Sequence, residues 1–250
     1  MMRALYTAST GMHAQQLNVD TIAHNMSNVN TTGYKKQRIE FQDLLYQTIK
    51  RPATNLDTNQ PVGLDVGLGV RPAASTTLFS QGNLQATDNP LDVAIQGQAF
   101  FAVEVPGRYE PLYTRDGAFK IDSEGQLVTA DGNFLVGVDT IPFEAFNVNI
   151  ERDGRVTYML PDIDEAEEAG QLELAKFINP AGLQKLGHNL YEWTPSSGEP
   201  VDWDPEDDNT VSLESNYLEM SNVQVVEEMV SLITAQRAYE INSKVIQSSD

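Results

Sequence analysis

Cysteine is absent from the sequence, and its absence excludes a disulfide framework and thiol chemistry. Long apolar runs are also missing: none approaches the ~18 residues of a membrane-spanning helix, so membrane insertion is not expected. The first residues hold a single basic side chain, Arg3, and Gly11 and His13 interrupt the apolar pattern, which does not fit a cleaved secretory signal. The 250 residues are 40% apolar, with a mean hydropathy of -0.34, which allows one large or two small hydrophobic cores.

Basic residues are scarce: 16 lysines and arginines face 36 aspartates and glutamates, which gives a net charge of -20. The imbalance is concentrated in residues 151–208, which include fifteen acidic and four basic side chains. Residues 1–51 have six basic and three acidic side chains. Nucleic acid and anionic membranes are therefore not expected as partners of the acidic region.

No combination of residues points to catalysis or to a bound metal or cofactor. His13, His24 and His188 are scattered, and neither a phosphate-binding GxxxxGK[ST] loop nor a GxSxG motif occurs. The acidic run at residues 202–208 fails the pattern of an EF-hand loop, because Asp207 and Leu213 stand where that loop needs glycine and glutamate. The sequence thus predicts no catalytic, cofactor-binding or metal-binding residues.

The N-terminal segment shows the pattern of a long amphipathic helix. Apolar residues recur at alternating steps of three and four, the a/d spacing of a coiled coil, with one polar interruption at Gln15. The Asn-rich stretch that follows, with Thr31, Thr32 and Gly33, predicts the end of this helix. The predicted seam consists of Leu5, Ala8, Met12, Val19, Ile22, Met26 and Val29.

The C-terminal segment shows a similar pattern and predicts a second long helix. Ser221 and Gln224 have the spacing of a capping box, and Glu227 and Glu228 suit the positive end of a helix dipole. Further apolar residues widen the stripe beyond what a two-helix contact needs, so more than one helical neighbour is expected. The predicted seam consists of Val225, Met229, Leu232, Tyr239 and Ile246.

The region between the helices is typical of antiparallel β structure. Asp-Gly or Glu-Gly pairs at residues 116–117, 124–125, 131–132 and 153–154 separate runs rich in Val, Ile, Phe and Tyr, a strong hairpin signal. Residues 93–105 are the best candidate for a core strand. The pattern of residues 38–49 leaves their secondary structure open.

Residues 52–70 form a candidate arm. Residues 51–61 are polar and bounded by prolines, and an alternating stretch follows, with one apolar face and one face of mostly glycine. An arm that reaches onto a neighbouring subunit and an internal strand of the β domain both fit this pattern. The residues that define the arm are Gly63, Leu64, Val66, Gly67, Leu68 and Gly69.

Motifs at both ends and in the centre of the chain resemble one protein family. At the N-terminus they are residues 4–8 and 25–35, at the C-terminus residues 221–223, 227–230 and 236–244, and in the centre residues 81–84, 91–95 and 113–117. Together they resemble the bacterial flagellar rod and hook axial proteins, and residues 41–47 resemble the subunits of the distal part of the rod. The motif residues singled out by this resemblance are Asn25, Asn28, Gly33, Arg237, Tyr239 and Asn242.

The resemblance implies a structural subunit, without enzymatic activity or cofactor, that self-assembles into a helical tube and transmits torque from motor to hook. It further implies export by the flagellar type III apparatus without a cleaved signal peptide, and a periplasmic place in the basal body. The implied partners are other copies, proximal rod and hook-side axial proteins, and the ring proteins that surround the rod as a bushing. An alternative is an extracytoplasmic β-rich binding module that its terminal helices dimerise.

The expected fold class is α+β, with long N- and C-terminal helices paired as a coiled coil and a central, all-antiparallel β domain. Residues 1–30 and 221–250 are expected to form the terminal helical domain. Residues 31–74 and 205–220 are expected to form a connecting region with the arm, and residues 75–204 the β-rich outer domain.

Overall fold

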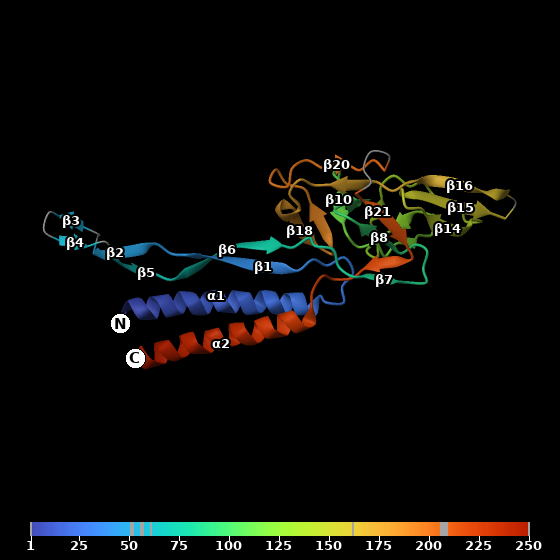
Figure 1. Cartoon of the computed structure of the whole chain (residues 1–250). Coiled ribbons are helices and arrows are strands. Elements are labelled where there is room, and N and C mark those ends of the chain that lie inside the picture. Colours follow the sequence, from blue (N-terminus) through green and yellow to red (C-terminus); the bar gives the residue numbers. More distant parts are fainter. Residues whose placement is uncertain are drawn as a thin grey trace. The chain divides into compact units, whose positions relative to one another are not determined.

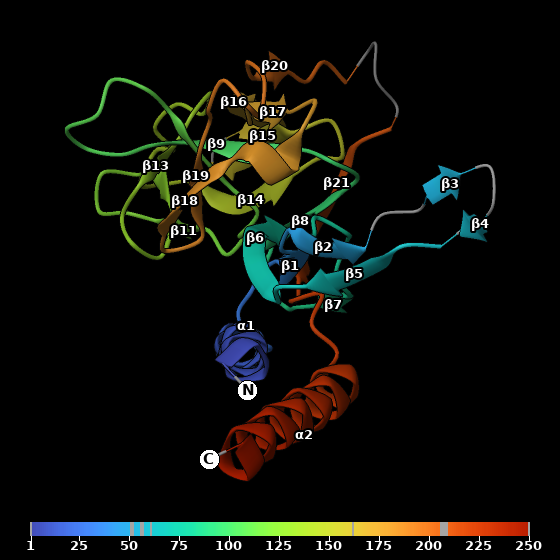
Figure 2. The same ribbon diagram turned by 90° about the vertical axis from the view of Figure 1, so that its left-hand side faces the viewer.

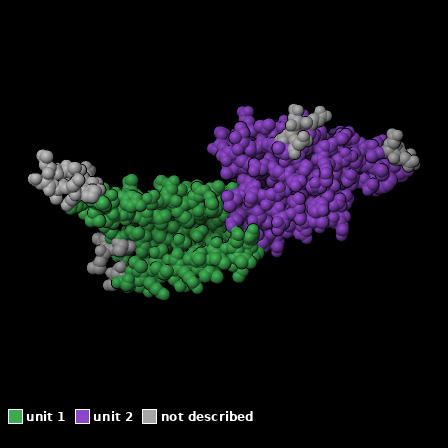
Figure 3. Space-filling model, in the orientation of Figure 1, with its two compact units in different colours: residues 1–27, 37–77, 224–250 green, residues 28–36, 78–223 purple. Residues whose placement is uncertain are grey.

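A computed structural model describes residues 2–50, 53–55, 58–60, 62–161, 163–205 and 210–249. The chain falls into two compact units (Figure 3). Unit 1 comprises residues 1–27, 37–77 and 224–250, and unit 2 comprises residues 28–36 and 78–223. The two long helices and the antiparallel β structure confirm the α+β class.

Unit 1 contains both helices and one long β-hairpin (Figure 1). Helix α1 (Met2–Ser27) lies beside α2 (Val225–Ser249), and its other side contacts the base of the hairpin. The hairpin consists of three successive antiparallel pairs. They are β1 (Gln37–Asp43) with β6 (Val70–Thr77), β2 (Tyr46–Lys50) with β5 (Leu64–Gly67), and β3 (Ala53–Asn55) with β4 (Thr58–Gln60).

The hairpin contains two segments whose structure the sequence left open, residues 38–49 and the alternating stretch from Leu64. Most of residues 38–49 form β1 and β2. The alternating stretch from Leu64 forms β5 and then the start of β6, with a break at Leu68 and Gly69. Among the described residues, β5 pairs with β2 of the same hairpin and not with strands of the β domain.

Unit 2 is built on one large antiparallel sheet and several smaller pairs. The order of the main path of the large sheet is β11 (Lys120–Ile121), β12 (Leu127–Val128), β13 (Phe134–Leu135), β9 (Phe100–Glu104), β10 (Leu112–Thr114), β19 (Leu190–Glu192) and β18 (Gln184–Gly187). Strand β17 (Leu174–Lys176) also pairs with β9 and with β20 (Val201–Asp202), and a short 3-10 helix η1 (Pro180–Gly182) precedes β18.

The remaining strands of unit 2 form three smaller antiparallel groups. They are β14 (Phe146–Ile150) with β15 (Arg155–Leu160) and β16 (Ile163–Gln171), β8 (Val93–Gln96) with β21 (Ser212–Ser215), and β7 (Leu84–Ala86) with β22 (Tyr217–Glu219).

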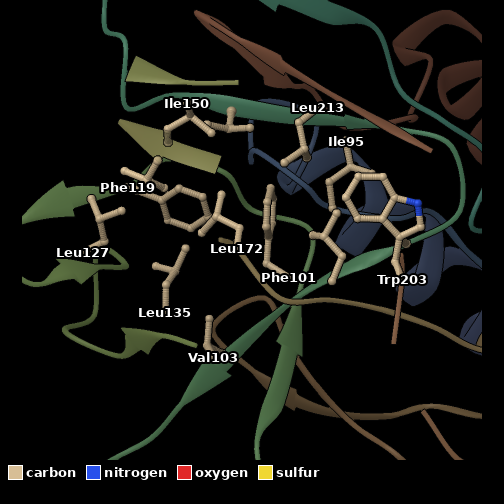
Figure 4. Close-up of a cluster of buried hydrophobic side chains, with 14 of the residues drawn as sticks. Ile95, Phe101, Val103, Phe119, Leu127, Leu135, Ile150, Leu172, Trp203 and Leu213 are labelled. Atoms are coloured by element: carbon tan, nitrogen blue, oxygen red, sulfur yellow. The ribbon is translucent and has the colours of Figure 1, made fainter. Parts of the chain in front are cut away.

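The apolar core of unit 2 lies between these strands (Figure 4). Phe101 and Phe119 meet edge to face with their ring centroids 4.9 Å apart, and both side chains are buried. Trp203 packs into the same cluster although it follows the short strand β20. Its side chain is 9% exposed, although the sequence around it is rich in Pro, Ser and Asp.

The predicted hairpin turns of unit 2 are largely confirmed. Gly125, Gly132 and Gly154 have φ values of 81°, 83° and 86°, and they lie between β11 and β12, β12 and β13, and β14 and β15. Gly117 differs, because it has no positive φ; a Cβ atom there would meet the Val93 carbonyl oxygen at 1.6 Å. Its lack of a side chain permits close backbone packing.

Two local predictions are wrong. Residues 93–105 form two strands, β8 and β9, because the chain turns at Gly97, whose φ is 114°, and the strands pair with different partners. The capping box fails because α2 begins at Val225, so Ser221 precedes the helix; its hydroxyl accepts a hydrogen bond from the Val223 amide at 3.3 Å. Glu227 and Glu228 do lie in the first turn of α2.

Candidate assembly surfaces on the helices and the hairpin

The contact between α1 and α2 includes small and polar residues, such as Gly11 and Asn242. Ala8, Ile22 and Ala235 are 5%, 5% and 3% exposed. A Cβ atom at Gly11 would approach the Asn242 amide nitrogen to 3.0 Å, so glycine permits the close approach of the helices at this point. The helices are not parallel, since Figure 2 shows α1 end-on and α2 oblique.

Asn25 joins α1 to β1 and α2. Its amide nitrogen donates to the Gln37 carbonyl at 2.9 Å and to Glu228 Oε2 at 3.3 Å, and its amide oxygen accepts from the Gln37 N–H at 2.9 Å. Asn25 and Glu228 are 1% and 2% exposed. The paired bonds to Gln37 imitate those of a neighbouring β-strand, so Asn25 fixes where β1 leaves α1.

The predicted N-terminal seam residues are all buried or half-buried. Ala8 and Ile22 are buried. Leu5, Met12, Val19, Met26 and Val29 are half-buried, and Val29 lies beyond the last helical residue, Ser27.

The predicted seam residues of α2 divide into two groups. Leu232 and Ile246 are half-buried. Val225, Met229 and Tyr239 are 42%, 51% and 42% exposed, so they are not buried within the single chain. The contact with α1 uses instead a row that includes Glu228, Ala235 and Asn242. The apolar pattern missed Glu228 and Ala235 as contact residues, because glutamate and alanine carry little weight in such a pattern. Asn242 is one of the residues that the family resemblance singled out.

The first half of α2 carries an exposed apolar face, which we name the α2 patch. Positions i, i+4 and i+8, with i+1 and i+5, share one face of a helix. Five exposed apolar residues occupy these positions: Val225, Val226, Met229, Val230 and Ile233, with 42%, 74%, 51%, 57% and 48% of their surface exposed. This patch is a candidate surface for contact with another helix.

A groove of about 520 Å³ runs between the two helices and is lined by Gln16, Val19, Gln236, Tyr239 and Glu240. Its wall combines a predicted seam residue, Val19, with a family-motif residue, Tyr239. Arg237, the neighbouring motif residue, is exposed.

The outer part of the hairpin is exposed on both strands. Leu45, Tyr46 and Ile49 are 84%, 60% and 56% exposed, and Val62 and Leu64 are 78% and 54% exposed. Such apolar exposure is unusual for a two-stranded ribbon that must be stable in water.

The remaining arm residues are Gly63, in the outer part of the hairpin, and four residues nearer its base. Gly63, Val66, Leu68 and Gly69 are half-buried, whereas Gly67 is exposed. A Cβ atom at Gly69, whose φ is 120°, would meet the Thr10 hydroxyl oxygen at 2.2 Å. The hairpin can therefore contact α1 closely at this position because residue 69 is glycine.

In unit 2, the family-motif residues Asn28 and Gly33 come shortly before Lys35, which belongs to a buried cluster of charged side chains. Gly33 has a φ of 66°, and its N–H donates to the Glu219 carbonyl at 2.8 Å. Asn28 accepts a backbone bond from the Thr31 N–H at 3.2 Å, which closes the turn after α1. Two residues beyond Gly33, Lys35 Nζ lies 2.6 Å from Glu219 Oε1.

The charge cluster contains one more basic group. Arg115 Nε lies 3.6 Å from Glu219 Oε2, and all three side chains are at most 1% exposed. Lys35 also donates to the Ser80 carbonyl at 2.9 Å, and Arg115 to the Gly97 carbonyl at 2.7 Å. Burial lowers the pKa of Lys35 and of Arg115, and the nearby Glu219 carboxylate opposes this shift in both.

Among the described residues, no group of three or more His, Cys, Asp or Glu side chains is placed to hold a metal ion. In that same part of the chain, no helix combines the length and apolar content of a membrane span.

Three family models match the chain. They are the flagella basal body rod protein at residues 5–35, the flagellar hook protein FlgE/F/G D1 domain at residues 94–158, and the flagellar basal body rod FlgEFG protein C-terminal at residues 214–250. Among solved structures, the Helicobacter pylori flagellar hook protein FlgE2 aligns with 74% of this chain and 43% of its own, at 14% identity and a TM-score of 0.27, too low for a comparison of folds.

Relatives match the chain over its whole length. The flagellar basal-body rod protein FlgG of Borreliella burgdorferi is 49% identical over 100% of this chain and 96% of its own. The proteins of the same description from Agrobacterium fabrum and Bacillus subtilis are 47% and 37% identical with the same coverage. The chain therefore belongs to the family of flagellar basal-body rod proteins FlgG.

Proposed function

We propose that the chain is a structural subunit that self-assembles into the distal rod of the flagellar basal body, the drive shaft that transmits torque from motor to hook. Membership of the FlgG family supports the role. The observation that carries the mechanism is the α2 patch, which is exposed in the single chain and remains available to another copy.

Self-assembly through this patch is physically reasonable. Burying one Val, Ile or Met side chain contributes about 1.5–3 kcal/mol, so a patch of several such residues supplies a substantial part of a subunit contact. A patch that meets a different surface on the next copy makes a heterologous contact, and such contacts produce open helical polymers when they do not close into a ring.

In the polymer, the helices of neighbouring copies pack as a coiled-coil layer on the inside of the shaft. These neighbours cover the half-buried seam residues of α1. They also cover Val225, Met229 and Tyr239 of α2, which are exposed in the single chain. The groove between α1 and α2 offers a place for a neighbouring side chain. This arrangement differs from a binding module dimerised by its helices, since α2 exposes apolar residues on more than one side.

The outer hairpin acts as an arm that stiffens the shaft. Bending a tube makes neighbouring subunits slide along its axis, and an arm that reaches onto the next subunit opposes that sliding. The exposure of Leu45, Ile49 and Leu64 supports this role, because it gives the arm apolar side chains to bury against a neighbour.

The subunit reaches the periplasm through the type III export apparatus without a cleaved signal peptide. It assembles there between the proximal rod and the hook-side axial proteins, inside the ring proteins that act as a bushing. The absence of cysteine suits a chain that crosses between redox compartments.

Charge substitution in the α2 patch tests the function. We expect Val226→Asp together with Val230→Asp to abolish sedimenting polymer while the monomer stays folded. Both side chains are exposed in the single chain, so the two introduced carboxylates become buried only when the subunits assemble. The matched control is Ser231→Asp, which adds a charge at an exposed position on another face of α2. Polymers of normal yield from the double variant, seen by sedimentation and electron microscopy, would show that α2 does not carry the subunit contact.

A further inference from the structure

Unit 2 exposes a second apolar surface, which is separate from the proposed assembly contacts. Phe143 is fully exposed at 102%, and Phe146 and Ile121 are 52% and 41% exposed. A hollow of about 440 Å³ lies at this place, at β11 and the start of β14, which are labelled in Figure 2. Its apolar lining comprises Ile121, Ile141, Pro142, Phe143, Ala145 and Val148.

The hollow is held in shape by backbone bonds. The Ile141 N–H donates to the Gly125 carbonyl at 2.8 Å, and the Ala145 N–H donates to the Pro142 carbonyl at 2.9 Å. A Cβ atom at Gly125 would meet the Ile141 carbonyl oxygen at 2.1 Å, so the two segments contact closely. The exposure of Phe143 therefore belongs to an ordered turn anchored by the buried Ile141, which is 3% exposed.

Acidic groups surround the apolar lining. Asp122 and Glu124 line the hollow, and Glu144 is exposed next to Phe143 in the sequence. The nearest basic residue in the sequence is Lys120, also exposed. An exposed aromatic side chain surrounded by acidic groups is complementary to a partner surface on which an apolar side chain is flanked by lysine or arginine.

We propose that this hollow docks a protein partner that presents an apolar side chain between basic residues. A second copy of the chain fits less well, because the chain has a net charge of -20 and its α2 patch contains the exposed Glu227 between Val226 and Met229. The partner is therefore a different protein with a basic contact surface.

Nuclear magnetic resonance of the full chain tests the proposal with a short peptide in which a Leu-Phe pair is flanked by lysines. The peptide should shift resonances of residues 121–125 and 141–148 to saturation, and added salt should weaken binding. Phe143→Ser should reduce the affinity about tenfold or more, the loss expected for a central aromatic anchor. The control Tyr109→Ser, at another fully exposed aromatic of unit 2, should leave the affinity unchanged.

Four outcomes would overturn the proposal. They are the absence of saturable shifts at these residues, equal binding of a peptide with glutamates in place of the lysines, an unchanged affinity in Phe143→Ser, and loss of binding in Tyr109→Ser as well. Sedimentation of the chain without peptide completes the test. Self-association that depends on Phe143 would identify a second copy as the occupant and would also contradict the proposed partner.

Discussion

Single residues matter most in the buried charge cluster of unit 2. Glu219 lies between Lys35 and Arg115, which come from the segment after α1 and from the loop between β10 and β11. Removing a single partner from such a group leaves an uncompensated buried charge, which costs far more than loss of a surface pair.

Glu219→Gln is therefore expected to destabilise the protein by about 3–5 kcal/mol, because Lys35 and Arg115 lose their counter-charge. Urea unfolding measures the change. The matched control is Glu214→Gln in β21, the strand that precedes β22 in the sequence; its partner Arg152 lies 3.4 Å away with its side chain 79% exposed. That variant should lose less than about 1 kcal/mol. Equal losses in the two variants would mean that the cluster contributes no more than a surface pair.

A second residue makes stability depend on pH. Burial lowers the pKa of Lys185 from 10.5 to about 8, and its ammonium group lies 5.9 Å from the centroid of the Tyr34 ring. Between these two pKa values the folded chain has released a proton that the unfolded chain still binds. The free energy of unfolding therefore contains a contribution that rises from pH 8 to pH 10.5.

Lys185→Met should remove this contribution. Urea unfolding of both proteins at about pH 7, 8.5 and 10 gives the comparison, with the stability advantage of the variant greatest at the lowest pH. Lys35 and Tyr191, whose pKa values are also shifted by burial, titrate in both proteins and cancel in the difference. Parallel curves across this range would exclude a shifted Lys185.

Residues with local roles could be predicted, and residues with distant partners could not. The glycines at 125, 132 and 154 were identified because an Asp-Gly or Glu-Gly pair determines its own turn. Lys35 and Glu219 meet across 184 positions, and Asn25 and Glu228 across 203. The sequence pattern of either partner alone does not reveal such a pair.

At the scale of elements, both helices could be predicted from apolar periodicity, but the face of α2 that contacts α1 could not. The strongest apolar residues of α2, such as Val226 and Val230, are exposed, and Ala235 lies against α1. In a single globular chain the most apolar stripe is normally buried. Its exposure here is the structural reason to look for contacts between copies.

The hairpin is the second element whose role depends on other copies. Its outer pairs, β2 with β5 and β3 with β4, are separate from the β1–β6 base, where the Leu44 N–H donates to the Gly69 carbonyl at 2.8 Å. The base can therefore be closed by a short turn without loss of β1 or β6. Residues 52, 56–57 and 61 of the candidate arm lie outside the described residues.

Replacing residues 46–67 by an Asn-Gly turn tests the arm. The monomer should keep its melting temperature within a few degrees, because Tyr46, Ile49, Val62 and Leu64, which are removed, are exposed. Polymers should form but be curved in electron micrographs. The control replaces Leu45 alone by serine, which removes one exposed contact and should leave polymers nearly straight. Straight polymers from the shortened protein, or an unfolded monomer, would count against a stiffening arm.

At the scale of the whole molecule, the account requires that the α2 patch becomes buried between copies. The absence of cysteine makes this directly measurable, because one introduced cysteine provides a unique thiol. Val230 is 57% exposed and Tyr109 is fully exposed, so a cysteine at either position should react readily in the monomer.

The most direct measurement compares maleimide labelling of Val230→Cys and Tyr109→Cys before and after polymerisation. The account predicts that assembly protects the thiol of Val230→Cys strongly relative to that of Tyr109→Cys, and that prior labelling at position 230 prevents assembly. Equal labelling of Val230→Cys in monomer and polymer would contradict the claim that this face of α2 joins the subunits.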